Sequence, residues 1–198
     1  MDKRLLKFKI DLLMENEIEK LKFPIGKYKA ILEFNFSRTV EDIKTLESFA
    51  GKLRESVKGL DKTDFKKSYR EGGMNIAQII HHYCDTHTYA FLRTKHTLLE
   101  DNPSVKMYEV SDFITTPDSN VLDVKDSLHV IEGMHAKWVS LLKTISEEDF
   151  TRTYYHSFRD KNIILHEHVG MYAWHTKHHL VHIEMAKENI KAKGKRSK

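Results

Sequence analysis

Two histidines spaced four residues apart, His175 and His179, form the pattern in this sequence that is best suited to chemistry. Each residue of an α-helix turns by about 100°, so these two imidazoles project from one face about one turn apart. This is the spacing at which a single helix offers two ligands to one metal ion. The sequence therefore predicts that His175 and His179 bind a divalent metal together.

A third ligand has to come from another part of the chain, and His82 is the best-placed residue. It lies among apolar residues of an expected helix, whereas its neighbour His81 projects about 100° away from it. Three neutral imidazoles leave at least one coordination position open to water or substrate, which is typical of a reactive site. We predict that His82, His175 and His179 bind the metal.

Other residues near these positions leave alternatives open. The glutamate of an HExxH motif is missing, because Thr176-Lys177-His178 separates the pair. Either His178 or His182 could act as a fourth ligand and close the shell, while Asp85 could orient an imidazole from outside it. Isolated histidines are expected to be hydrogen-bonded core or boundary residues, and these are His87, His96, His129, His135, His156 and His166.

Four helices are needed to carry these residues. Apolar periodicity predicts helices at about residues 39–58, 76–100, 123–144 and 167–192. The second is expected to start at an Asn75 N-cap, with Gln78 completing a capping box. A connection of about twenty residues, unusually long for a bundle, joins the second helix to the third. We therefore predict an all-α four-helix bundle.

Composition places limits on the kind of protein. The 198 residues fit one domain, and we assign residues 1–190 to it, with 1–22 as an N-terminal extension. No apolar run of about 18 residues predicts a membrane span, and the N-terminal residues lack the continuous apolar stretch and small-residue cleavage site from which a secretory signal would be expected. Cys84 is the single cysteine, so an internal disulfide is excluded and a reducing, cytoplasmic location is expected. Cys84 itself is expected to be a packed residue rather than a ligand.

The net charge of +4 is concentrated at the C-terminus. Residues 191–198 contain five lysines or arginines and no acid, so residues 1–190 carry a net charge of −1. A nearly neutral body provides no basic groove, and we expect no nucleic-acid partner. The tail is expected to be a solvated, frayed end.

Several motifs together resemble one known family. They are Phe23-Pro24-Ile25-Gly26-Lys27-Tyr28, Tyr69-Arg70-Glu71-Gly72-Gly73, Ile80-His81-His82, Asp85-Thr86-His87, Trp138 and the segment from Tyr172 to Ile183. In order and spacing, over about residues 23–190, the chain resembles the DinB/YfiT-like superfamily, and most closely its YfiT-type metal-dependent hydrolases. The resemblance implies a four-helix bundle, usually a cytoplasmic homodimer, with a three-histidine metal centre.

The resemblance also implies which residues bind the metal. They would be the second histidine of the His-His pair, His82, and the two that follow Trp174 at one and five positions, His175 and His179. One departure is notable: relatives often have Gly-Gly-Trp-Thr where this chain has Gly72-Gly73-Met74-Asn75. Asn75 can still cap a helix, but the missing tryptophan is expected to reshape the mouth of the site.

Two classes of function remain open at this point. The first is an enzyme in which Zn²⁺, or another divalent ion such as Ni²⁺, activates water as a hydrolase or a low-molecular-weight thiol as an S-transferase. The second is a metal-binding helical bundle without turnover, favoured if a fourth protein ligand closes the shell. Haem bound by two histidines is a third possibility that no motif supports.

Overall fold

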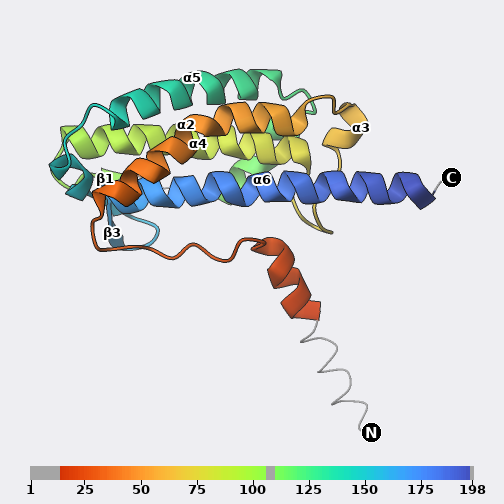
Figure 1. Cartoon of the computed structure of the whole chain (residues 1–198), viewed down its shortest axis with the longest axis horizontal. Coiled ribbons are helices and arrows are strands. Elements are labelled where there is room, and N and C mark those ends of the chain that lie inside the picture. Colours follow the sequence, from red (N-terminus) through yellow and green to blue (C-terminus); the bar gives the residue numbers. More distant parts are fainter. Residues whose placement is uncertain (1–13, 106–109, 197–198) are drawn as a thin grey trace, which may run out of the picture.

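The computed structural model describes residues 14–105 and 110–196. Four long helices form a bundle (Figure 1): α2 (Phe36–Val57), α4 (Ile76–Leu99), α5 (Lys125–Leu142) and α6 (Leu165–Arg196). Helix α2 packs against α5 and α6, and α4 packs against the same two helices. This arrangement confirms the predicted all-α four-helix bundle.

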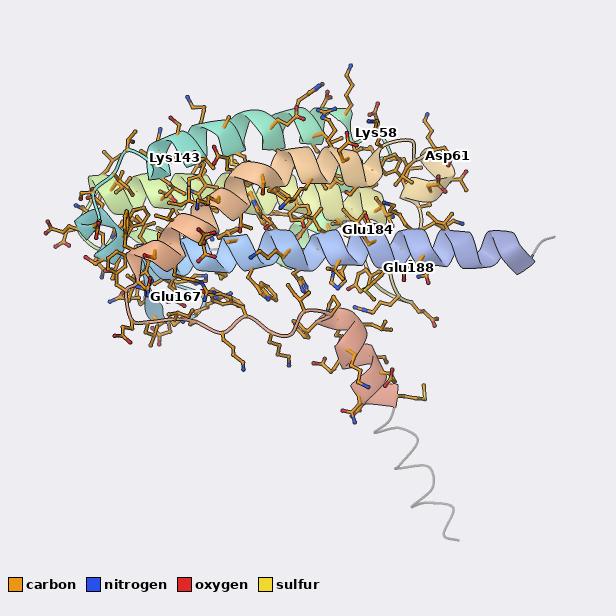
Figure 2. The ribbon with its side chains drawn as sticks, viewed as in Figure 1. Lys58, Asp61, Lys143, Glu167, Glu184 and Glu188 are labelled. Carbon is orange, nitrogen blue, oxygen red and sulfur yellow. The ribbon has the colours of Figure 1, made fainter. Side chains whose placement is uncertain are left out.

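The helices begin and end where local sequence chemistry favours it. The side chain of Asn75 accepts from the backbone N–H of Gln78 at 2.8 Å, and the side chain of Gln78 accepts from the N–H of Asn75 at 3.0 Å, so the predicted capping box at the start of α4 is present. On α2, the predicted apolar stripe lies in the core, where Leu46 and Phe49 are buried completely or nearly so. On the outside of the bundle, charged side chains such as Lys58 and Lys143 project from the helix ends (Figure 2).

The long connection between α4 and α5 has a structural reason. In Figure 1, α4 and α5 run in the same direction, so the chain has to return along the whole bundle before α5 can start. Two 3₁₀ helices on this return path, η1 (Val110–Thr115) and η2 (Asp118–Asn120), pack against α4. The Gln78 side chain at the start of α4 donates to Asn120 Oδ1 at 3.1 Å, which fixes the end of the crossover.

Short elements close the two ends of the bundle. Helix α3 (Lys62–Phe65) follows α2, and η3 (Glu148–Thr151) follows α5. A small sheet, which the sequence did not predict, joins β1 (Ser104–Val105) in parallel to β2 (Thr153–His156), and β2 in antiparallel to β3 (Lys161–Ile164). Four-residue strands are too short to give a clear period of two, so they were missed.

The segment before α2 lies along α6. Residues 14–22 are helical, a turn closed by the bond from the Gly26 N–H to the Phe23 carbonyl at 2.9 Å follows, and extended chain comes after it. In Figure 1 this extended chain runs beside α6. The Tyr28 hydroxyl donates to the carbonyl of Glu167 at 3.0 Å, and the Phe23 ring lies 5.9 Å from the ring of His178. The segment between residue 22 and α2 therefore reaches the helix that carries the predicted ligands.

One prediction about α6 was wrong. The expected frayed tail from residue 191 is helical as far as Arg196, so the helix continues past Gly194. The tail contains lysine, alanine and arginine, which favour helices, and one glycine costs only about 1 kcal/mol in a helix that is already formed. Among the described residues, no helix is long and apolar enough to cross a membrane.

Candidate metal centre

The bundle brings the three predicted ligands together at the contact between α4 and α6. One ligand nitrogen from each of His82, His175 and His179 lies within 4.8 Å of the other two. The closest pair is His82 Nε2 and His175 Nε2, which are 3.2 Å apart. The His175 and His179 rings, with centroids 4.6 Å apart, project from the same face of α6 as their spacing predicts.

Burial keeps these imidazoles neutral. The loss of solvent lowers the pKa of His82 to about 4, and lowers the pKa of both His175 and His179 well below the ordinary value of 6.5. Neighbouring imidazoles of the cluster lower the pKa of His175 and His179 further. A neutral imidazole has a lone pair to donate, which is the protonation state that metal binding requires.

The residues fit a divalent metal. The donor set consists of three neutral imidazoles. The Nε2 atoms of His82 and His175 face each other at 3.2 Å, so both are placed to donate lone pairs to one ion. In the described part of the chain, the clusters able to hold a metal contain histidines alone and no carboxylate.

A second histidine cluster adjoins the first. His178, His179 and His182 also bring one nitrogen each within 4.8 Å, so His179 belongs to both groups. The His182 ring stacks on Tyr69 with centroids 3.8 Å apart, and its Nε2 lies 3.1 Å from the carbonyl oxygen of Leu21. His178 lies between the rings of Trp174 and Phe23. Neither His178 nor His182 belongs to the group that contains His82.

Other residues considered from the sequence have different roles. His81 bonds Ser127 Oγ at 2.8 Å and lies near the Val121 carbonyl, away from the site as expected. Cys84 is half-buried, and burial raises its pKa to about 11, so it is a packed thiol rather than a nucleophile. Asp85 lies near Asp118 and His81, and no hydrogen bond in the described chain joins it to a predicted ligand. Trp138 is buried in the core.

The sequence did not indicate which residues hold the predicted ligands in place. His87 Nε2 lies 2.9 Å from His175 Nδ1, and His182 Nδ1 lies 3.1 Å from His179 Nδ1. His135 reaches His87 in turn, at 2.9 Å. His87 and His135 are core histidines, as expected, but their spacing along the chain carries no sign that they meet the site.

A cavity opens onto His82. It has a volume of about 440 Å³, within the range of small-molecule sites. Arg70 is the charged residue among the described side chains that line it, and the Arg70 Nε is buried without a partner. The mouth is formed by the segment in which the chain departs from the usual Gly-Gly-Trp-Thr, and Met74 stands where the tryptophan would be. The lining residues are Tyr69, Arg70, Gly72, Gly73, Met74, Gln78, His82 and Ile114.

Comparison with known proteins identifies the family. Residues 45–183, more than two thirds of the chain, match the model of the DinB superfamily. The chain belongs to the DinB superfamily. The match spans α4, α5 and the part of α6 that carries the predicted ligands.

Individual relatives of this DinB protein support the assignment to the family. A Geobacillus kaustophilus protein, provisionally named a metal-dependent hydrolase, is 35% identical over 166 residues, which cover 84% of this chain and 93% of the relative. YfiT of Bacillus subtilis, provisionally named in the same way, is 31% identical over 163 residues, 82% of this chain and 92% of its own. A solved structure of YfiT, described as a probable metal-dependent hydrolase with an unusual four-helix-bundle topology, superimposes with a TM-score of 0.83 at 30% identity, covering 87% of this chain and 98% of that one.

Proposed function

We propose that this protein is a metal-dependent enzyme in which His82, His175 and His179 hold one divalent ion, with Zn²⁺ the leading candidate. The observation that carries the proposal is the convergence of three neutral imidazoles beside a cavity of small-molecule size, with His179 buried and His82 and His175 half-buried. The names of the relatives support the same class of function.

The geometry favours an open site over a closed one. His182, one of the two residues that could have closed the shell, already bonds Leu21 and His179. His178 belongs to the second cluster and lies between two aromatic rings. Among the described residues the group around His82 has no fourth protein ligand, so a position remains for a reactant, which favours an enzyme over a metal-binding bundle without turnover.

Between water and a thiol as the reactant, we propose a small thiol. A divalent ion held here would supply Lewis acidity that lowers the pKa of a group in the open position. Water needs a general base as well, and no described carboxylate lies among the candidate ligands. A thiol starts with a pKa near 8.5, so it ionises without such a base. The thiolate would then attack an electrophilic second substrate and displace its leaving group.

Arg70 gives the cavity a charge preference. Its Nη1 donates to the carbonyl of Glu71 at 2.8 Å, while its buried Nε has no partner in the described chain. A guanidinium held in this way can bind a carboxylate or phosphate of an entering molecule. We propose that Arg70 orients an anionic group on the thiol or on its co-substrate.

The test is an assay of the metal-loaded protein with an aryl ester and an aryl chloride, each with and without a small thiol. We expect thiol-dependent loss of the aryl chloride that disappears in His82→Ala and persists in His96→Ala, an exposed histidine elsewhere on α4. Ester hydrolysis that needs no thiol and disappears in His82→Ala would support a hydrolase instead of a thiol transferase. Full metal occupancy without turnover of any substrate would favour the metal-binding bundle.

The assembly and location are proposed on the resemblance and on cysteine usage. We propose a cytoplasmic homodimer, and sedimentation of the purified protein tests the dimer. A mass equal to one chain at micromolar concentration would rule it out.

A further inference from the structure

A row of hydrogen-bonded imidazoles leads from a backbone carbonyl through the buried His135 and His87 to the predicted ligand His175. His135 Nδ1 lies 3.0 Å from the carbonyl oxygen of Leu46, and His135 Nε2 lies 2.9 Å from His87 Nδ1. His87 Nε2 lies 2.9 Å from His175 Nδ1. His87 and His135 are 0% and 2% exposed, so water does not interrupt the row. The residues come from all four helices of the bundle, α2, α5, α4 and α6 in that order.

The carbonyl at the end fixes every proton in the row. A carbonyl oxygen can only accept, so His135 Nδ1 has to carry the proton, and in a neutral ring Nε2 is then an acceptor. His87 therefore donates from Nδ1 to His135, and accepts at Nε2 from Nδ1 of His175. This leaves His175 Nε2 without a proton, and His175 Nε2 is the nitrogen that faces His82.

A shorter hydrogen-bonded row fixes the tautomer of a second ligand, His179, in the same way. His182 Nε2 lies 3.1 Å from the carbonyl oxygen of Leu21, so it is the donor. His182 Nδ1 is then an acceptor, and it lies 3.1 Å from His179 Nδ1, which has to donate. His179 Nε2 is left without a proton. Two independent rows thus give the same tautomer at the two ligands of α6.

His82 has no such support. Its Nδ1 is buried without a hydrogen-bond partner in the described chain. Its Nε2 lies 3.2 Å from His175 Nε2, the nitrogen that carries a lone pair in the assigned tautomer. Without metal, His82 therefore has to donate from Nε2. With metal, the proton has to move to Nδ1. Of the three ligands, His82 is the one whose tautomer must change.

We propose that His135 and His87, together with His182, are positioning residues that preset His175 and His179 in the Nδ1-protonated tautomer and so hold their Nε2 lone pairs toward the metal. The proposal rests on the proposed function in that it takes His175 and His179 as metal ligands. Imidazole here takes the place of the carboxylate or carbonyl that usually holds a metal-binding histidine.

Two other interpretations of the same residues are less consistent with these contacts. A second metal at His178, His179 and His182 would take the His179 and His182 lone pairs, but their Nδ1 atoms are at hydrogen-bond distance from each other. A proton path through His135 would need a group that gives or takes a proton at its far end. The Leu46 carbonyl does neither, so the row holds protons rather than moving them.

The first experiment uses the unaltered chain. Long-range ¹⁵N–¹H correlation spectra of the ¹⁵N-histidine-labelled, metal-free protein report the tautomer of each ring. We expect Nδ1-protonated rings for His135, His87, His175 and His179, and the Nε2-protonated form for His82 and His182. Addition of Zn²⁺ should switch His82 alone. An Nε2-protonated His175 in the metal-free protein would overturn the long row.

The second experiment measures Zn²⁺ affinity by competition with a chromophoric chelator. Loss of a residue that holds a ligand typically weakens metal binding about 10- to 100-fold, so we expect this range for His135→Phe. His135→Gln, whose amide has one donor and one acceptor, should stay within about threefold of the parent. His168→Gln is the matched control. It is equally buried between the Ala90 carbonyl and the Tyr154 hydroxyl, and it should not change the affinity.

The outcomes separate this inference from the proposed function. Unchanged Zn²⁺ affinity in a folded His135→Phe variant would overturn the inference while the metal site stands. If that variant does not fold, the tautomers of the unaltered chain and the His135→Gln affinity decide. Two zinc ions per chain would overturn the short row in favour of a second metal. A parent that binds no zinc would refute the proposed function, whereas the metal-free tautomers would still test the hydrogen-bonded rows.

Discussion

At the scale of single residues, the site differs from many metal centres in the absence of negative charge. The described groups that bond the predicted ligands are other imidazoles, and all of them are kept neutral by burial. A divalent ion in this shell would keep its full charge of +2, since no carboxylate offsets it. With Arg70 at the cavity, the result is a strongly electropositive pocket, which suits a thiolate or another anion.

Gly73 is needed for close packing at the cavity mouth. A Cβ at this position would lie 2.9 Å from Arg70 Cγ and 3.0 Å from Tyr69 Cε1. Tyr69 stacks on His182 and cannot move freely. We therefore expect Gly73→Ala to destabilise the protein by about 1–3 kcal/mol in urea unfolding. Gly51→Ala is the control: it lies in α2 with nothing within 4 Å, and should stabilise by about 0.5–1 kcal/mol. Equal effects of the two substitutions would contradict this account.

His168 makes the stability of the fold depend on pH. Burial between Tyr154 and Ala90 lowers the pKa of His168 from 6.5 to about 3. The unfolded chain takes up a proton near pH 6.5 while the folded chain does not, so the contribution is complete above that pH. It is lost as pH falls from about 6.5 toward 3, at about 1.4 kcal/mol per pH unit.

The measurement is the slope of unfolding free energy against pH between 6 and 4.5, with a chelator present. His168→Gln is expected to reduce this slope by about 1.4 kcal/mol per pH unit, which corresponds to the uptake of one proton. The exposed His96 serves as control, and His96→Gln should leave the slope as it is. A slope that is the same in His168→Gln and the parent would show that His168 is protonated in the folded chain.

At the scale of elements, the start of α4 depends on its capping box, in which the Asn75 side chain accepts from the N–H of Gln78. Asn75→Ala removes the acceptor for the N–H of Gln78, and we expect a loss of about 1 kcal/mol in thermal or urea unfolding. Asn75→Ser keeps a capping oxygen and should cost much less. His82 lies two turns further along α4, so zinc affinity should change little in either variant. A large loss of affinity in both would mean that the cap also sets the site.

The helices were predictable because their signals are local. The Asn75 and Gln78 box and the apolar stripe of α2 each lie within a few residues, and both were found as expected. The pair His175 and His179 was also predictable, because its four-residue spacing is a local signal. What the sequence could not show is contact between distant segments. The row through His135 joins residues 48 and 88 positions apart, and the strands β2 and β3 depend on each other rather than on their own four residues.

The parallel course of α4 and α5 was also beyond a reading of single helices. The connection between α4 and α5 is long because it returns along the bundle, and it packs against α4 on the way. Ile114 of η1 then lines the cavity, so the crossover forms one wall of the site. Met74, at which the chain departs from its relatives, lines the cavity.

At the scale of the whole molecule, the N-terminal extension contributes to the site. The Leu21 carbonyl accepts from His182 Nε2. Removal of residues 2–22 should therefore weaken Zn²⁺ binding, by about 10-fold or more if His182 loses its orientation. Leu21→Ala, which keeps the backbone carbonyl, is the control and should leave the affinity unchanged. Both are measured by chelator competition, and equal affinities would show that the extension is dispensable to the metal.

The position of the two halves of the site along the chain has a further consequence. His82 and His175 are separated by 93 positions, so an ion bound to both would close a loop of that length, as a disulfide does. For a permanent link around a loop of about 100 residues, the chain-entropy model gives about 4–5 kcal/mol. Unlike a disulfide, this link opens at acidic pH or in a chelator and needs no oxidant. The metal would thus serve this chain, which has a single cysteine, as a reversible cross-link between α4 and α6.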